Sequence, residues 1–129
     1  MIIIRKCRSF EQAIRDYRRL CNPRRVGKVC ADWNRRSATV ILREGLGASP
    51  VMEAILKQLA DAPQALTAEA VNARIAGKLG STQTLLARLA STEPSLVERE
   101  IWRSRPITYA YRLNDLGRMV MACEVDDGQ

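Results

Sequence analysis

Residues 67–89 read TAEAVNARIAGKLGSTQTLLARL. Thr67 is a favourable helix N-cap, and the apolar residues that follow it recur at helical spacing. A turn bracketed by Gly77 and Gly80 comes next, and Ser81 predicts the cap of a second helix. The side chains expected to face the core are Ala70, Val71, Ile75, Leu85, Leu86 and Leu89. The stretch therefore predicts two amphipathic helices joined by a tight turn.

One more helix is predicted before this pair. Ser49 is a favourable N-cap and Pro50 suits the first helical position, so we expect a helix that runs to about Ala60. Gly45 and Gly47 come shortly before it and interrupt the helical pattern. We therefore expect the boundary between two modules at these glycines.

A β-hairpin and a last helix are predicted after the pair. Residues 96–102 and 108–113 are rich in residues that favour strands, and Arg103-Ser104-Arg105-Pro106 predicts the turn between them. Asn114 predicts the cap of a helix that runs to about Ala122. The side chains expected on its inner face are Leu116, Met119 and Val120.

The first third of the chain holds all of its excess charge. The 129 residues include 21 Lys and Arg and 14 Asp and Glu, a net charge of +7. Residues 1–47 carry twelve basic and four acidic side chains, or +8, whereas residues 48–129 carry nine and ten, or −1. This predicts a basic N-terminal segment (1–47), a domain (48–123) and an acidic tail (124–129). An arginine-rich segment indicates an anionic partner, most commonly nucleic acid, with acidic protein or anionic lipid as alternatives.

The basic segment has one clear element and one ambiguous one. The residues Ile2–Ile4 favour a short strand, and Ser9 predicts the cap of a helix from about Phe10 to Leu20. A loop with Arg24, Arg25, Gly27 and Lys28 is expected next. Residues 37–42 fit a strand or part of a helix, and the pattern does not separate these alternatives.

The chain contains no histidine, which excludes Ser-His-Asp and Cys-His catalysis and histidine-based zinc chemistry. No nucleophile is arranged with a base and no glycine-rich phosphate loop is present, so we expect no enzyme, no cofactor and no metal. The cysteines Cys7, Cys21, Cys30 and Cys123 match no common metal spacing and favour buried thiols, with a redox role left open. Without a signal peptide or a spanning segment, the expected location is the cytoplasm.

From residue 49 onward the order of elements resembles the winged helix-turn-helix domain of bacterial transcription regulators, particularly the MarR-like and related families. Residues 51–60 and 67–75 resemble the first two helices, and residues 81–89 resemble the recognition helix. Leu96-Val97-Glu98-Arg99-Glu100 resembles the first strand of the wing, with Ser95 where glycine is usual. Residues 111–118, YRLNDLGR, resemble the junction between the last strand and the last helix.

The resemblance implies an α+β, mostly helical fold and a sequence-specific regulator, repressor-like and homodimeric, that binds duplex DNA. It places the recognition helix in the major groove and the wing on the backbone or in the minor groove. The DNA-binding residues that it implies are Lys78, Ser81, Thr82, Gln83, Thr84, Arg88, Arg103 and Arg105.

Charge adds a further expectation about the basic segment. Arg24 and Arg25 are expected to reach flanking phosphates, together with Arg18, Arg19, Lys28, Arg35 and Arg36. Two alternatives stay open: this segment dimerises or binds an acidic protein, and the whole chain is an adaptor or inhibitor that uses a winged-helix scaffold without reading DNA. Arg88 also has a simpler interpretation, which is an ion pair with an acid.

Overall fold

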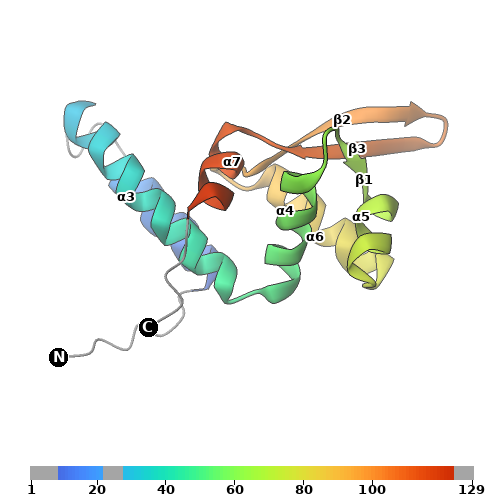
Figure 1. The fold of residues 1–129 in the computed structure, drawn as a ribbon. Coiled ribbons are helices and arrows are strands. Elements are labelled where there is room, and N and C mark those ends of the chain that lie inside the picture. Colours follow the sequence, from blue (N-terminus) through green and yellow to red (C-terminus); the bar gives the residue numbers. More distant parts are fainter. Residues whose placement is uncertain (1–8, 22–27, 124–129) are drawn as a thin grey trace.

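A computed structural model describes the backbone of residues 9–21 and 28–123, and the side chains of residues 9–21 and 38–123 (Figure 1). The expected strand at Ile2–Ile4, the loop positions Arg24 and Arg25, and the acidic tail lie outside the described residues. The described chain is α+β and mostly helical. Its elements are α1 (Phe10–Leu20), α3 (Lys28–Gly47), α4 (Pro50–Asp61), β1 (Leu66–Thr67), α5 (Ala68–Ile75), α6 (Leu79–Ser91), β2 (Val97–Ser104), β3 (Ile107–Leu113) and α7 (Asp115–Ala122).

The ambiguous stretch belongs to the long helix α3, which also includes Lys28. Ala38, Leu42 and Leu46 follow one another at four-residue spacing and are fully buried, and α3 packs along α1. Gly45 does not break this helix. A Cβ at Gly45 would lie 2.6 Å from the Cβ of Ala13, so the glycine lets the two helices approach closely.

The predicted helices α1, α4, α5 and α7 are confirmed, and three of them have side-chain caps. Ser9 Oγ accepts a hydrogen bond from the backbone N–H of Gln12 at 3.2 Å at the start of α1. Thr67 Oγ1 accepts a hydrogen bond from the backbone N–H of Ala70 at 3.2 Å. Asn114 Oδ1 accepts one from the backbone N–H of Gly117 at 2.8 Å. One inner-face expectation for α7 is wrong, because Met119 is 44% exposed while Val120 is fully buried.

The turn between α5 and α6 differs from the expectation. Its left-handed residue is Ala76, with φ 51°, rather than a glycine. The backbone N–H of Thr82 already donates to the carbonyl of Lys78 at 3.0 Å, so α6 begins at Leu79, with Lys78 in the cap position. Ser81 is therefore not a cap, and Gly80 lies inside the first helical turn rather than in the loop.

The sheet has three antiparallel strands in the order β1-β3-β2. The two-residue strand β1 was not predicted, because so short a strand has no alternation to detect; it pairs Leu66 with Tyr111. The hairpin strands continue through Ser104, so the turn is only Arg105-Pro106 rather than the four residues expected. A register shift interrupts the β2–β3 pairing between Ile101 and Arg103. Figure 1 shows this hairpin reaching past the helices.

One hydrophobic cluster connects all of these helices and the sheet. It runs from the aromatic residues of α1, through α3 and α4, to Leu86 and Leu89 of α6 and Val120 of α7. The helix α6 and the base of the hairpin are both packed on this core. Their outer surfaces are therefore held in a defined relation to each other.

Candidate nucleic-acid interface

The outer face of α6 carries mostly short polar side chains. Gln83, Thr84 and Arg88 are exposed, whereas Leu86 and Leu89 on the other face are fully buried. The Thr84 hydroxyl donates to the carbonyl of Gly80 at 2.9 Å, within its own helix. A helix with short polar side chains outward fits a groove about 12 Å wide. Lys78 and Ser81 are also exposed, in the cap position and the first turn.

Thr82 is a correction to the expected contact set. Its side chain is 1% exposed, and its hydroxyl donates to Asn72 Oδ1 of α5 at 2.8 Å. The side chain therefore joins the two helices and is not available to a ligand. Its partner lies ten positions earlier in the chain, so helical spacing alone did not reveal this role.

Replacing Thr82 by valine keeps its shape and removes this hydrogen bond. We expect Thr82→Val to lower the free energy of unfolding by about 1–2 kcal/mol, because the partly buried Asn72 side chain loses its hydrogen-bond donor. Thr84→Val is the matched control, and we expect it to change stability by less than about 0.5 kcal/mol, since that site is exposed. Urea denaturation of both variants measures the difference. Equal losses would contradict the structural role of Thr82.

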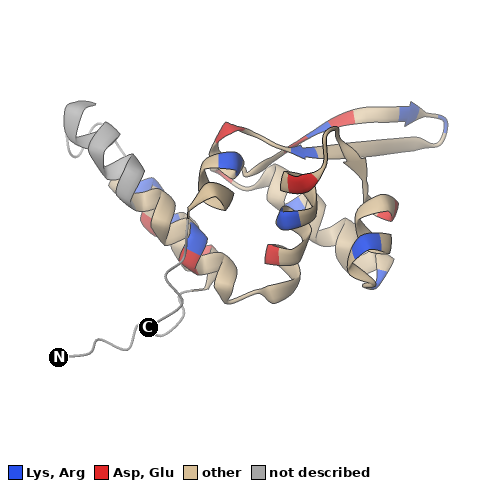
Figure 2. Cartoon of the chain, viewed as in Figure 1, with Lys and Arg blue, Asp and Glu red and all other residues tan. Residues whose placement is uncertain are grey.

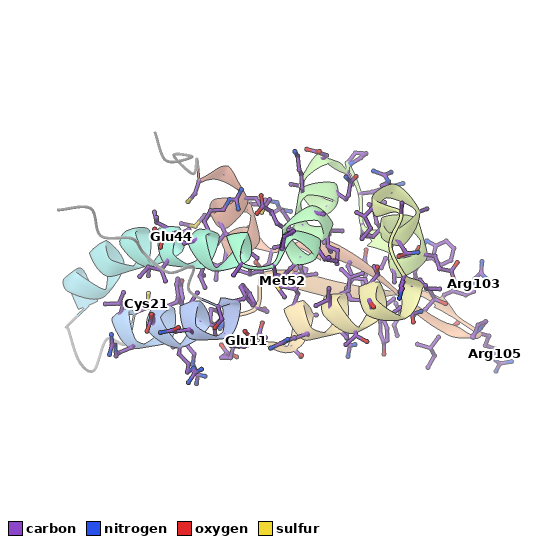
Figure 3. The ribbon with its side chains drawn as sticks, turned by 90° about the horizontal axis from the view of Figure 1, so that it is seen from below. Glu11, Cys21, Glu44, Met52, Arg103 and Arg105 are labelled. Atoms are coloured by element: carbon purple, nitrogen blue, oxygen red, sulfur yellow. The ribbon has the colours of Figure 1, made fainter. Side chains whose placement is uncertain are left out.

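Arg88 has a partner that is distant in sequence. Its guanidinium is paired with the carboxylate of Glu11 in α1, and the two side chains are 45% and 47% exposed. An exposed ion pair of this kind contributes only about 0–1 kcal/mol to stability. Its importance is positional, because it joins the last turn of α6 to the first turn of α1 (Figure 3). The simpler interpretation of Arg88 is thus confirmed, although this residue still lies on the outer face of α6.

The hairpin carries the second group of candidate residues. Arg103 and Arg105 are exposed, and Figure 3 shows them at its far end. Arg99 was not predicted; its guanidinium lies 4.3 Å from the ring centroid of Tyr109. Among the side chains described, no carboxylate lies within ion-pair distance of these three arginines. By contrast, Arg112 donates to Glu98 at 2.6 Å. Figure 2 shows that basic positions mark the tip of the hairpin.

A third group of candidate residues, all of them arginines, lies on α1. Arg15, Arg18 and Arg19 are exposed and have no ion-pair partner within residues 9–21 and 38–123. They line a hollow of about 600 Å³ with Glu93 and Pro94 from the segment that follows α6. The hollow carries three positive charges and one negative charge. The predicted contacts Arg24 and Arg25 lie outside the described residues. The exposed arginines described in the basic segment are therefore those of α1.

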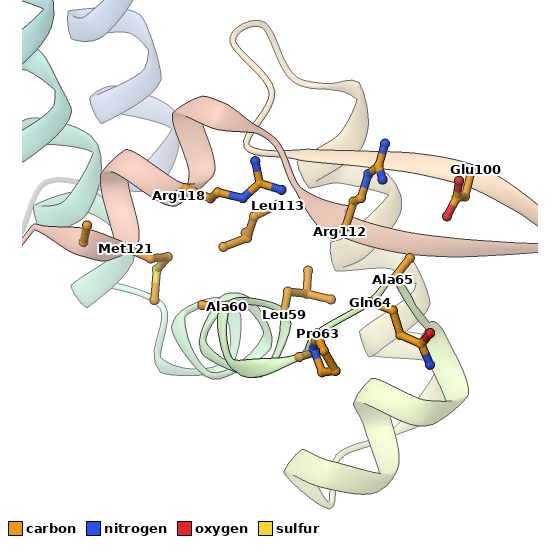
Figure 4. A pocket seen from close by; sticks show the side chains of 12 residues that line it. Leu59, Ala60, Pro63, Gln64, Ala65, Glu100, Arg112, Leu113, Arg118 and Met121 are labelled. Atoms are coloured by element: carbon orange, nitrogen blue, oxygen red, sulfur yellow. The ribbon is translucent and has the colours of Figure 1, made fainter.

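The cleft in Figure 4 differs from the hollow on α1 in the balance of its charges. It has about 550 Å³ and lies between the end of α4, the sheet and α7. Its two arginines each have a carboxylate partner: Arg112 pairs with Glu98, and Arg118 pairs with Asp115 at 3.2 Å. Glu100 adds a further negative charge to the lining. This local balance does not favour an anionic ligand.

The described cysteines do not form a redox pair or a metal site. Cys21 and Cys123 are both free thiols. Burial raises the pKa of the Cys123 thiol, and the positive charge of Arg43 opposes this shift only in part. Across residues 9–21 and 38–123, no three potential metal-ligating side chains gather.

The candidate interface therefore combines the outer face of α6, the arginines of the hairpin and the basic surface of α1. Within the described part of the chain, no helix has the length and apolar character needed to cross a membrane. Comparison of this chain with known protein families, curated proteins and solved structures found no match.

Proposed function

We propose that this protein is a sequence-specific regulator of transcription that binds duplex DNA through a winged helix-turn-helix domain. One observation carries the proposal: the exposed polar face of α6 accompanies a hairpin whose Arg99, Arg103 and Arg105 have no described carboxylate partner. Guanidinium groups without a carboxylate partner can bind phosphates, and a helix with short polar side chains can enter the adjacent major groove.

In this proposal α6 enters the major groove, where Gln83 and Thr84 contact base edges. Glutamine reads adenine by two hydrogen bonds, and a threonine methyl packs on thymine. Arg103 and Arg105 contact the backbone or the minor groove, and Lys78 and Ser81 contact phosphates near the start of α6. The regulator is repressor-like and acts as a homodimer in the cytoplasm, so that its site is a repeated half-site.

The arginines of α1 extend this interface. Arg15, Arg18 and Arg19 bind phosphates that flank the site read by α6, and the Arg88–Glu11 pair marks where α1 meets the last turn of α6. These arginines belong to the N-terminal third of the chain, which holds the excess positive charge. The rest of the chain has a net charge of −1, so the attraction to the duplex comes in part from α1.

Replacing Gln83 by alanine tests the reading of bases. Duplexes are selected from a random pool with the wild-type protein, and affinities for a selected and a scrambled duplex are measured by fluorescence anisotropy. We expect Gln83→Ala to weaken binding to the selected duplex about tenfold, and binding to the scrambled one hardly at all, because base contacts carry the specificity. The matched control is Gln64→Ala, which removes an exposed glutamine from the loop after α4.

Two outcomes would contradict the proposal. If Gln83→Ala weakens both duplexes equally, α6 contributes affinity without reading bases. If the wild-type protein binds no duplex at low salt, DNA binding itself is wrong. The second candidate function, a protein-binding adaptor or inhibitor on the same scaffold, would then replace it. The balanced charge of residues 48–129 favours that candidate.

A further inference from the structure

The far half of the β2–β3 hairpin carries an exposed apolar patch. Ile101 is 62% exposed, Trp102 57% and Ile107 65%, whereas the next most exposed large apolar side chain of the described residues, Val51, reaches 49%. Single exposed apolar residues are ordinary on a protein surface, but a cluster on one element indicates a binding surface. We call Ile101, Trp102 and Ile107 the wing patch.

Two residues of the patch, Ile101 and Ile107, continue the apolar side of the sheet outward from the core. Tyr111 is buried, and Tyr109 and Ile107 follow at two-residue steps on the same face of β3, with increasing exposure. Ile101 lies opposite Tyr109 on β2. This face thus runs from the packed interior onto the part of the hairpin that projects beyond the helices in Figure 1.

Two arginines lie beside the patch, and their charge indicates the class of partner. Arg105 is exposed in the turn next to Ile107, and Arg103 places its guanidinium 4.8 Å from the ring centroid of Trp102. Neither has a carboxylate partner among the described side chains. Apolar side chains edged by free guanidinium groups suit a polyanion that also offers apolar faces. The minor groove of a duplex meets both needs, with phosphates at its edges and sugars and stacked bases inside.

We propose that the tip of the hairpin enters the minor groove as an apolar wedge and that the protein bends the duplex it binds. Ile107 opens a base step, Arg103 and Arg105 lie along the groove, and Ile101 and Trp102 cover the adjoining sugars. Wedges of this kind kink DNA by about 20–90° toward the major groove. This inference rests on the proposed DNA binding and adds a deformation of the duplex to it.

The test measures bending and binding separately. A selected duplex of about 30 base pairs, roughly three helical turns, carries a donor and an acceptor dye at its ends. We expect energy transfer to rise when wild-type protein saturates the duplex, because a bend brings the ends together. With Ile107→Ser we expect the rise to fall by more than half, while affinity drops less than about tenfold, since the unstacking cost disappears with the wedge. The control Val51→Ser removes an exposed apolar side chain from α4 and should bend the duplex like the wild type.

Three results would overturn the inference, and they are distinguishable. If the wild type binds the duplex without raising energy transfer, the wedge is wrong and the proposed function stands. If Ile107→Ser keeps the full bend but turns a dimeric free protein into a monomer on sedimentation, the wing patch is an interface between two copies. If the wild type binds no duplex at low salt, the wedge and the proposed function are both wrong.

Discussion

Replacing Gly117 by alanine is expected to destabilise the protein by about 3 kcal/mol, the upper part of the usual range for overpacking a core. A Cβ at Gly117 would lie 2.1 Å from the carbonyl oxygen of Leu96 and 3.1 Å from Cδ2 of Leu113. The oxygen belongs to the backbone and cannot rotate away. It also accepts the hydrogen bond from the backbone N–H of Asn114 at 3.1 Å, so it is held in place. To admit the methyl group, α7 must move off the sheet and Val120 must leave the core.

Urea denaturation followed by circular dichroism measures this loss as a lower midpoint with an unchanged slope. The matched control is Gly80→Ala in α6, because nothing lies within 4 Å of a Cβ at Gly80. Since glycine inside a helix is less favourable than alanine, we expect this control to stabilise the protein by about 0.5–1 kcal/mol. A Gly117→Ala variant as stable as the wild type would contradict the close contact between α7 and Leu96.

Features that depend on neighbouring residues were predicted best. Thr67 and Asn114 cap their helices through residues only three positions away, and that relation is visible in the sequence. The glycines show the limit of such reasoning. The local preference of glycine predicts a helix break at Gly45. The reason for a glycine there is instead the close contact with Ala13 of α1, which lies 32 positions earlier (45 − 13). Only the packed helices show that a small residue is needed there.

The same limit applies to the candidate site. The exposure of Gln83 and Thr84 follows from the helical pattern of α6, and it was predicted. The pairing of Arg88 with Glu11 joins residues 77 positions apart, so no local pattern contains it. Arg99 was missed because its importance depends on strand register, which places Tyr109 within reach of its guanidinium.

Neutralising the α1 surface is expected to have the largest effect on binding. The variant Arg15→Gln/Arg18→Gln/Arg19→Gln should reduce the slope of log affinity against log salt by 2 to 3, because each phosphate contact contributes about 0.9. A slope loss of about 2.7 between 1 M and 0.15 M salt corresponds to roughly 170-fold weaker binding at the lower concentration. Fluorescence anisotropy across a salt series measures both quantities. All three side chains are exposed, so the fold should be unaffected.

A control variant separates contact from overall charge. Lys57→Gln/Arg112→Gln/Arg118→Gln removes the same number of positive charges from exposed positions on α4, β3 and α7. If the α1 arginines touch phosphates, only the α1 variant changes the slope, because counterion release depends on the contacts made. Shortening the duplex to the segment read by α6 should then remove the difference between wild type and the α1 variant. Equal slope losses in both variants would mean that α1 acts only through net charge, and an unchanged slope would return the basic segment to the role of a protein-binding surface.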